Sequence, residues 1–131
     1  MSSEIRWRQR YGNFTRALDR LADAVDRESY SDLERAGLVQ TFEFTFELAW
    51  KTLKDLMNYE GYDADSPREV IKVGFANGYI IDADIWLEAL ESRNVLTHTY
   101  DEKAAEQAVK LIRETYYPVV RRLHDELKKR L

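Results

Sequence analysis

Apolar residues recur every three or four positions along the first part of the chain. Between residues 5 and 27 they form one stripe, made of Trp7, Tyr11, Phe14, Leu18, Leu21 and Val25. A repeat of three and four marks one face of an α-helix, whose period is about 3.6 residues. The charged residues of the segment fall elsewhere on the helix. This stretch is therefore predicted to be an amphipathic helix that packs on a core.

The next segment is apolar on more than one side. It is predicted to be a helix from about residue 32 to residue 59, with Ser31 as a plausible N-cap. Phe44 and Leu48 face nearly the opposite way from a stripe that comprises Phe42, Phe46, Ala49, Leu53 and Leu56. Such a helix is either central in its bundle or packs in addition on another subunit, and central burial is the commoner arrangement.

A short third helix is bracketed by start and stop signals. Ser66 fits the N-cap, Pro67 fits the first helical position, and Glu69 completes the pattern of a capping box. Before this helix, Gly61 is placed to end the second one. After it, the pair at 77–78 (Asn-Gly) is a stop signal.

Two more helices complete the chain. The fourth begins with Asp82 or Asp84 as N-cap and ends near residues 98–100, because an acidic pair then starts the last helix. Pro118 is expected to kink or restart that last helix. The sequence therefore predicts an all-α protein with a single domain over residues 1–131: an up-and-down antiparallel helical bundle of four long helices plus a short fifth.

Composition and charge narrow the functional class. The chain has 20 Lys and Arg against 24 Asp and Glu, a formal net charge of −4, which disfavours nucleic-acid binding by bulk electrostatics. Local basic patches stay possible, since arginines gather near both ends of the sequence. The absence of cysteine excludes disulfides and thiolate metal sites and is compatible with a reducing compartment. We expect a cytoplasmic protein without a membrane partner, a metal or a cofactor.

The densest cluster of side chains that could take part in catalysis or binding lies between residues 91 and 101. It contains Arg93, Asn94, His98 and Tyr100. On a helix Asn94 and His98 share a face, whereas Arg93 and His98 are about 140° apart on an ideal wheel. The latter two would meet on one small group only through the length of the arginine, a distorted helix end or a second copy of the chain.

Two interpretations of this cluster are open. Histidine titrates near neutral pH and arginine binds phosphate in a fork, so the pair suits phosphoryl chemistry without a metal. Alternatively, Arg93 pairs with Glu91 or Asp101, while His98 satisfies the C-terminal carbonyls of its helix. Spacing alone favours this second interpretation, because polar helix ends are common and active sites are few.

A family resemblance favours the first interpretation, a site for phosphoryl chemistry. The residues Arg93 to Tyr100 spell R-x4-H-x-Y, which resembles the motif of the HEPN superfamily in toxins that are paired with minimal nucleotidyltransferases. The segments 46–55 (Phe-Glu-Leu-Ala-Trp-Lys-Thr-Leu-Lys-Asp), 66–69 (Ser-Pro-Arg-Glu) and 91–94 (Glu-Ser-Arg-Asn) resemble the branch called nucleotidyltransferase substrate-binding proteins. The likeness extends over roughly residues 5–125.

The resemblance implies a homodimer with paired Arg/His motifs in a shared cleft and a metal-independent endoribonuclease activity. In that activity Arg93 would bind the scissile phosphate of RNA, His98 would be the general acid/base, and Asn94 would support them. The resemblance also implies a small nucleotidyltransferase partner, an antitoxin that adds AMP to Tyr100. One alternative is a non-catalytic substrate-binding subunit of a two-component nucleotidyltransferase. Another is a structural dimer with neither role.

Overall fold

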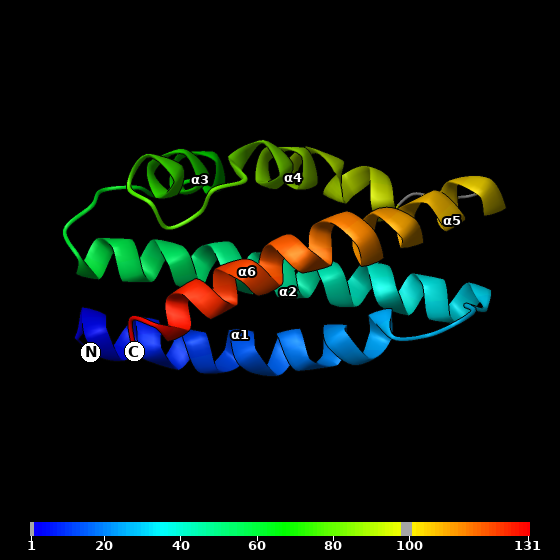
Figure 1. Cartoon of the computed structure of the whole chain (residues 1–131), viewed down its shortest axis with the longest axis horizontal. Coiled ribbons are helices and arrows are strands. Elements are labelled where there is room, and N and C mark those ends of the chain that lie inside the picture. The colour runs from blue at the N-terminus through cyan, green and yellow to red at the C-terminus, as the bar shows by residue number, and fades with distance from the viewer. Residues whose placement is uncertain (1, 98–100) are drawn as a thin grey trace.

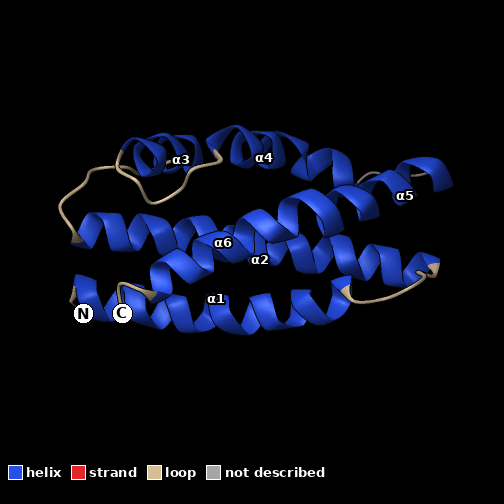
Figure 2. Cartoon of the chain, viewed as in Figure 1, coloured by secondary structure: helices blue, strands red, loops and turns tan. Residues whose placement is uncertain are grey.

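The computed structural model describes residues 2–97 and 101–131, and of residues 93–97 the backbone alone. Figures 1 and 2 show helices joined by short connections. They are α1 (Ser3–Val25), α2 (Asp32–Tyr59), α3 (Pro67–Ala76), α4 (Ala83–Thr97), α5 (Glu102–Leu111), the π-helical turn η1 (Ile112–Tyr116) and α6 (Tyr117–Lys128). Since α5, η1 and α6 follow one another without a break, the described residues form the predicted all-α bundle of four long helices and a short one.

Helix α2 lies at the centre of the bundle. It contacts α1, α3, α4, α5 and α6, and in Figure 1 it runs between α1 on one side and α3 and α4 on the other. Its predicted stripe is buried, with Phe42 at 0% and Phe46 at 1% exposure, whereas Phe44 is 60% exposed. The prediction of a central core helix is therefore confirmed, and Phe44 accounts for the second apolar side of the pattern.

A chain of aromatic contacts joins α2 to the helices around it. Phe42 and Phe46 meet edge to face at 5.8 Å between ring centroids. Phe46 lies 5.4 Å from Trp86 of α4, and Phe42 stacks on Tyr116 of η1 at 5.5 Å. Such ring pairs contribute about 0.5–1.5 kcal/mol each beyond the area they bury. This aromatic chain therefore fixes α4 and η1 relative to the middle of α2.

The N-caps of α2 and α3 use the predicted serines in two different ways. The Ser31 hydroxyl accepts from the Glu34 N–H at 3.2 Å, while the Glu34 carboxylate accepts from the Ser31 N–H at 2.9 Å, a reciprocal capping box. At α3, Ser66 accepts from the Glu69 N–H at 3.2 Å, but its hydroxyl donates to the Glu69 carboxylate at 3.1 Å. Ser66 is the predicted cap, yet Glu69 contacts its hydroxyl rather than forming the backbone half of a box.

The start of α4 resolves the choice between Asp82 and Asp84. The Asp82 carbonyl accepts from the N–H groups of Ile85 at 3.0 Å and Trp86 at 3.2 Å, so Asp82 is the residue that precedes the helix. Its carboxylate pairs with Arg122 of α6. The same residue therefore begins α4 and ties it to the last helix.

The predicted break at Pro118 takes the form of a π-helical turn. Proline has no N–H and its ring clashes with the carbonyl four residues earlier, so an unbroken α-helix is unfavourable here. In the structure η1 directly precedes α6, and the Tyr117 N–H binds the Ile112 carbonyl five residues back. The chain thus keeps its direction while changing its hydrogen-bond pattern.

Candidate functional site

The predicted site residues lie at and beyond the C-terminal end of α4. Arg93 and Asn94 belong to α4, whose described part ends at Thr97. Their side chains, and the whole of His98 and Tyr100, lie outside what the structure describes. The assignment of the four residues to a site therefore stays a prediction. What the structure gives is the surroundings of the helix end that bears them.

The end of α4 is held against η1. The hydroxyls of Ser92 and Tyr116 lie 3.5 Å apart, and Tyr116 is buried with 1% exposure against Phe42. Because Arg93 directly follows Ser92, its backbone is positioned by this contact. The series of contacts from Phe42 through Tyr116 thus reaches Ser92, the residue that precedes the motif.

The two carboxylates considered as partners of Arg93 each have another role in the described residues. Glu91 lies 3.2 Å from Arg68 of α3 in an exposed ion pair. Asp101 is the N-cap of α5, where its carboxylate accepts from the Ala104 N–H at 2.7 Å. A carboxylate can accept from more than one donor, so these contacts leave both interpretations of the cluster open.

The surface of α5 and η1 has a depression that the sequence pattern did not predict. It has a volume of about 380 Å³, and its described lining comes from α5 and η1: Gln107, Lys110, Leu111, Glu114 and Thr115. The spacing of these residues puts them on one helix face. In the sequence they look like a solvated surface stripe, and the nearby Pro118 was the only local signal that the helix departs from regularity here.

The second histidine, His124 of α6, is a packed residue. Its ring stacks on Tyr11 at 4.8 Å between centroids, and its Nε2 lies 2.8 Å from the Thr15 hydroxyl oxygen. That hydroxyl donates to the Tyr11 carbonyl at 2.9 Å, so its oxygen is left to accept from Nε2–H. Burial lowers the pKa of His124, against the opposing effect of Asp125. His124 is therefore held neutral as part of the α1–α6 contact.

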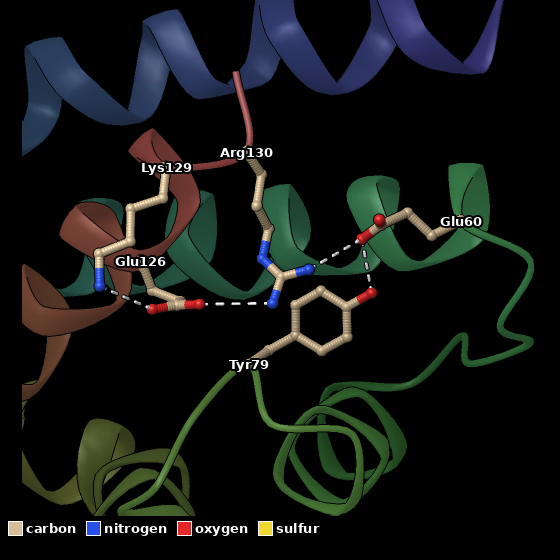
Figure 3. Close-up of polar contacts among 5 residues, drawn as sticks. All are labelled: Glu60, Tyr79, Glu126, Lys129 and Arg130. Atoms are coloured by element: carbon tan, nitrogen blue, oxygen red, sulfur yellow. Dashed lines mark hydrogen bonds and ion pairs between the residues drawn. The ribbon is translucent and has the colours of Figure 1, made fainter.

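A polar clasp joins the end of α6 to the end of α2 (Figure 3). Tyr79 donates to Glu60 at 2.6 Å, and the guanidinium of Arg130 lies 4.3 Å from the centre of the Tyr79 ring. Arg130 also contacts Glu60 at 3.4 Å and Glu126 at 3.3 Å, and Lys129 pairs with Glu126 at 3.5 Å. Burial, together with the hydrogen bond to Glu60, raises the pKa of Tyr79, so the phenol keeps its proton as a donor.

Two kinds of feature are missing from the part of the chain that the structure describes. No group of three or more His, Asp or Glu side chains is arranged to hold a metal ion. None of the helices there combines the length and the apolar character needed to cross a membrane.

A central aromatic helix surrounded by α1, α3, α4, α5 and α6, together with an R-x4-H-x-Y sequence whose first residues lie in α4, defines a HEPN-like helical bundle. Within that class, the chain belongs to the family described as nucleotidyltransferase substrate binding protein like, whose model matches residues 9–129.

Solved structures agree with this assignment. A protein from Thermus thermophilus is 31% identical and superposes with a TM-score of 0.74 over 89% of this chain and 97% of its own. A Haemophilus influenzae protein, described as having the fold of a substrate binding domain of a nucleotidyltransferase, is 21% identical with a TM-score of 0.63. That superposition covers 97% of this chain and 99% of the other, and at that identity the likeness shows the fold.

A curated relative carries a name that refers to catalysis. It is the probable ribonuclease HepT of Haemophilus influenzae strain Rd, which is 32% identical over 75 residues. The match takes in 53% of this chain and 51% of the relative, so it spans about half the length of that protein.

Proposed function

We propose that the protein is the toxin of a toxin–antitoxin pair, a metal-independent endoribonuclease that a small nucleotidyltransferase silences by adding AMP to Tyr100. The observation that carries the proposal is the sequence R-x4-H-x-Y, which begins at Arg93 of α4, in a member of this family. The similarity to a probable ribonuclease supports catalysis. The family description supports a nucleotidyltransferase partner.

In the proposed reaction His98 takes the proton of a ribose 2′-hydroxyl. The 2′-oxygen attacks the adjacent phosphorus, the bond to the 5′-oxygen breaks, and a protonated histidine gives its proton to that leaving oxygen. The products are a 2′,3′-cyclic phosphate and a 5′-hydroxyl. Arg93 binds the non-bridging oxygens and offsets the negative charge that gathers on them.

A homodimer fits this chemistry better than one chain does. Arg93 and His98 are about 140° apart on an ideal helix, so one copy brings them together poorly. A two-fold axis near the ends of two α4 helices supplies two arginines and two histidines to one cleft. One histidine can then act as the base while the other acts as the acid.

Addition of AMP to Tyr100 would switch this site off. The tyrosine oxygen attacks the α-phosphorus of ATP and pyrophosphate leaves, which places a nucleotide two residues from His98. The new phosphodiester carries negative charge, which repels an incoming RNA phosphate, and its bulk occupies the cleft.

The deciding experiment compares the wild type with His98→Ala on a labelled RNA in the presence of a chelator. We expect cleavage and growth inhibition to fall by about 10²–10⁴-fold, the usual contribution of a general acid/base. His124→Gln is the matched control, because it removes the other histidine and should keep activity. Equal cleavage and equal toxicity of wild type and His98→Ala would overturn the proposal.

The family description also favours a second candidate, a non-catalytic subunit that presents substrate to a nucleotidyltransferase. It requires tight binding of the partner together with no cleavage by the purified chain. A nuclease signal that disappears in Arg93→Ala would reject this candidate.

A further inference from the structure

We propose that the depression on α5 and η1 binds a nucleotide of the RNA adjacent to the scissile phosphate, with Lys110 as its phosphate contact. This inference rests on the proposed function and adds to it. It names a substrate-binding surface outside the R-x4-H-x-Y segment, and it assigns residues to the positioning of the strand.

The depression lies close to the helix that carries the motif. Helix α4 contacts η1, and the Ser92–Tyr116 contact of 3.5 Å sets how the two are aligned. Thr115, in the lining of the depression, directly precedes Tyr116, and Arg93 directly follows Ser92. Figure 1 shows the end of α4 and the α5 segment at the same end of the bundle. One end of the depression, at Thr115, therefore lies next to Tyr116, the residue through which η1 contacts the helix that carries the first residues of the motif.

The side chains that line the depression can contact each part of a nucleotide. Lys110 is exposed, has no ion-pair partner among residues 2–92 and 101–131, and can bind a phosphate as a point charge. Glu114 and Gln107 can accept from and donate to ribose hydroxyls and base edges, and Leu111 gives an apolar surface for a base. A single cation beside a carboxylate, an amide and an apolar side chain suits a whole nucleotide better than a bare phosphate.

Size and backbone agree with this use. A volume of about 380 Å³ lies within the range of about 300–1,000 Å³ that is typical of small-ligand sites. Part of the wall, Glu114 and Thr115, belongs to the π-helical turn η1, and π-helical turns occur frequently at functional sites.

The test is RNA binding by Lys110→Ala in a His98→Ala background, measured by the anisotropy of a short fluorescein-labelled single-stranded RNA. We expect the Kd to rise about fivefold to tenfold, and the slope of log Kd against log salt to fall by about 0.7 for one lost phosphate contact. Lys110→Arg should restore most of the affinity. In the active protein Lys110→Ala should raise KM by a similar factor and leave kcat within about twofold.

Lys72→Ala is the matched control. Lys72 is an exposed lysine of α3, at the opposite end of the bundle in Figure 1, and its removal changes the net charge by the same amount. If the wild type cleaves RNA while Lys110→Ala and Lys72→Ala have the same Kd and KM, the inference is wrong and the proposed function stands.

Other outcomes separate the two proposals. If the wild type does not cleave RNA but Lys110→Ala still weakens RNA binding, the subsite stands as a binding surface and the proposed cleavage fails. If Lys110→Ala weakens binding of the nucleotidyltransferase and leaves RNA binding unchanged, the depression is a protein interface and the inference is overturned.

Discussion

At the scale of single residues, the two histidines of this chain have separate tasks. His98 belongs to the motif and is proposed for proton transfer. His124 lies between Tyr11 and Thr15 and is held neutral. In the sequence, only the neighbouring residues distinguish the two histidines. His98 has an arginine five positions before it, whereas His124 lies in an ordinary amphipathic repeat.

The lowered pKa of His124 gives a prediction about stability against pH. The unfolded chain has an ordinary histidine pKa of about 6.5, and burial lowers the pKa in the folded state. Between the two values the unfolded chain binds more protons, so the free energy of unfolding rises with pH in that window. Stability should therefore decrease as the pH falls below about 6.5.

Chemical unfolding at pH 7.5 and at pH 5.5 measures this effect. We expect wild type to lose more stability than His124→Gln over this interval, because the variant has no ring to protonate. The other charges near the ring, Asp19, Asp125, Arg121 and Lys128, are the same in both proteins. Equal losses in the two proteins would contradict the assignment.

At the scale of elements, α1 and α2 are joined by a polar contact inside an apolar interface. Asp55 of α2 is 9% exposed, and its Oδ2 lies 2.8 Å from Nε of Arg10 of α1. The same oxygen has no hydrogen bond of good geometry. The N–H of Arg10 therefore does not point at Oδ2, and the two side chains interact as an ion pair. The positive charge of Arg10 offsets the free-energy cost of burying this carboxylate.

Removing Arg10 should therefore destabilise the protein by about 1–3 kcal/mol, because it leaves a buried carboxylate without its counter-charge. Urea unfolding of Arg10→Ala measures the loss, and Arg6→Ala, an exposed arginine of the same helix, is the control. Adding Asp55→Asn to Arg10→Ala should recover part of the loss, since the uncompensated charge is then gone. A loss no larger than that of Arg6→Ala would show that the pair contributes little.

The elements themselves follow closely from the sequence. The stripe that begins at Trp7 predicted α1, and local signals at Ser31, Ser66 and Gly61 predicted helix ends that the structure confirms. These features depend on neighbours within one or two turns. By contrast, the Arg10–Asp55 and Asp82–Arg122 pairs join residues distant in the sequence, and their partners are decided only when the helices assemble.

At the scale of the whole molecule, the motif residues were predicted from the sequence, whereas the depression on α5 and η1 was not. A family resemblance singled out Arg93 and His98, which an ideal helix would place about 140° apart. Nothing in the sequence set Lys110 apart from other exposed lysines. The role proposed for it depends on the packing of η1 against α4, in which the buried Tyr116 takes part.

The partner enzyme offers the last prediction. Incubation with the nucleotidyltransferase partner that the proposal requires, together with ATP, should add AMP to the wild type and none to Tyr100→Phe, as measured by intact mass. Tyr62→Phe, a change at another exposed tyrosine, should be modified as the wild type is. The modified protein should lose RNA cleavage. Modification of Tyr100→Phe at the wild-type rate would place the acceptor elsewhere.

The clasp of Tyr79, Glu60 and Arg130 lies at one end of the bundle, and the end of α4 lies towards the other (Figures 1 and 3). The two ends are joined by α2 and by the unbroken run of α5, η1 and α6. Substitutions at distant sites that share no partner usually have additive effects on stability. Changes in the clasp should therefore alter the stability of the bundle without altering the surface on α5 and η1. If that surface binds RNA as proposed, tolerance to heat and choice of target can diverge separately within the family.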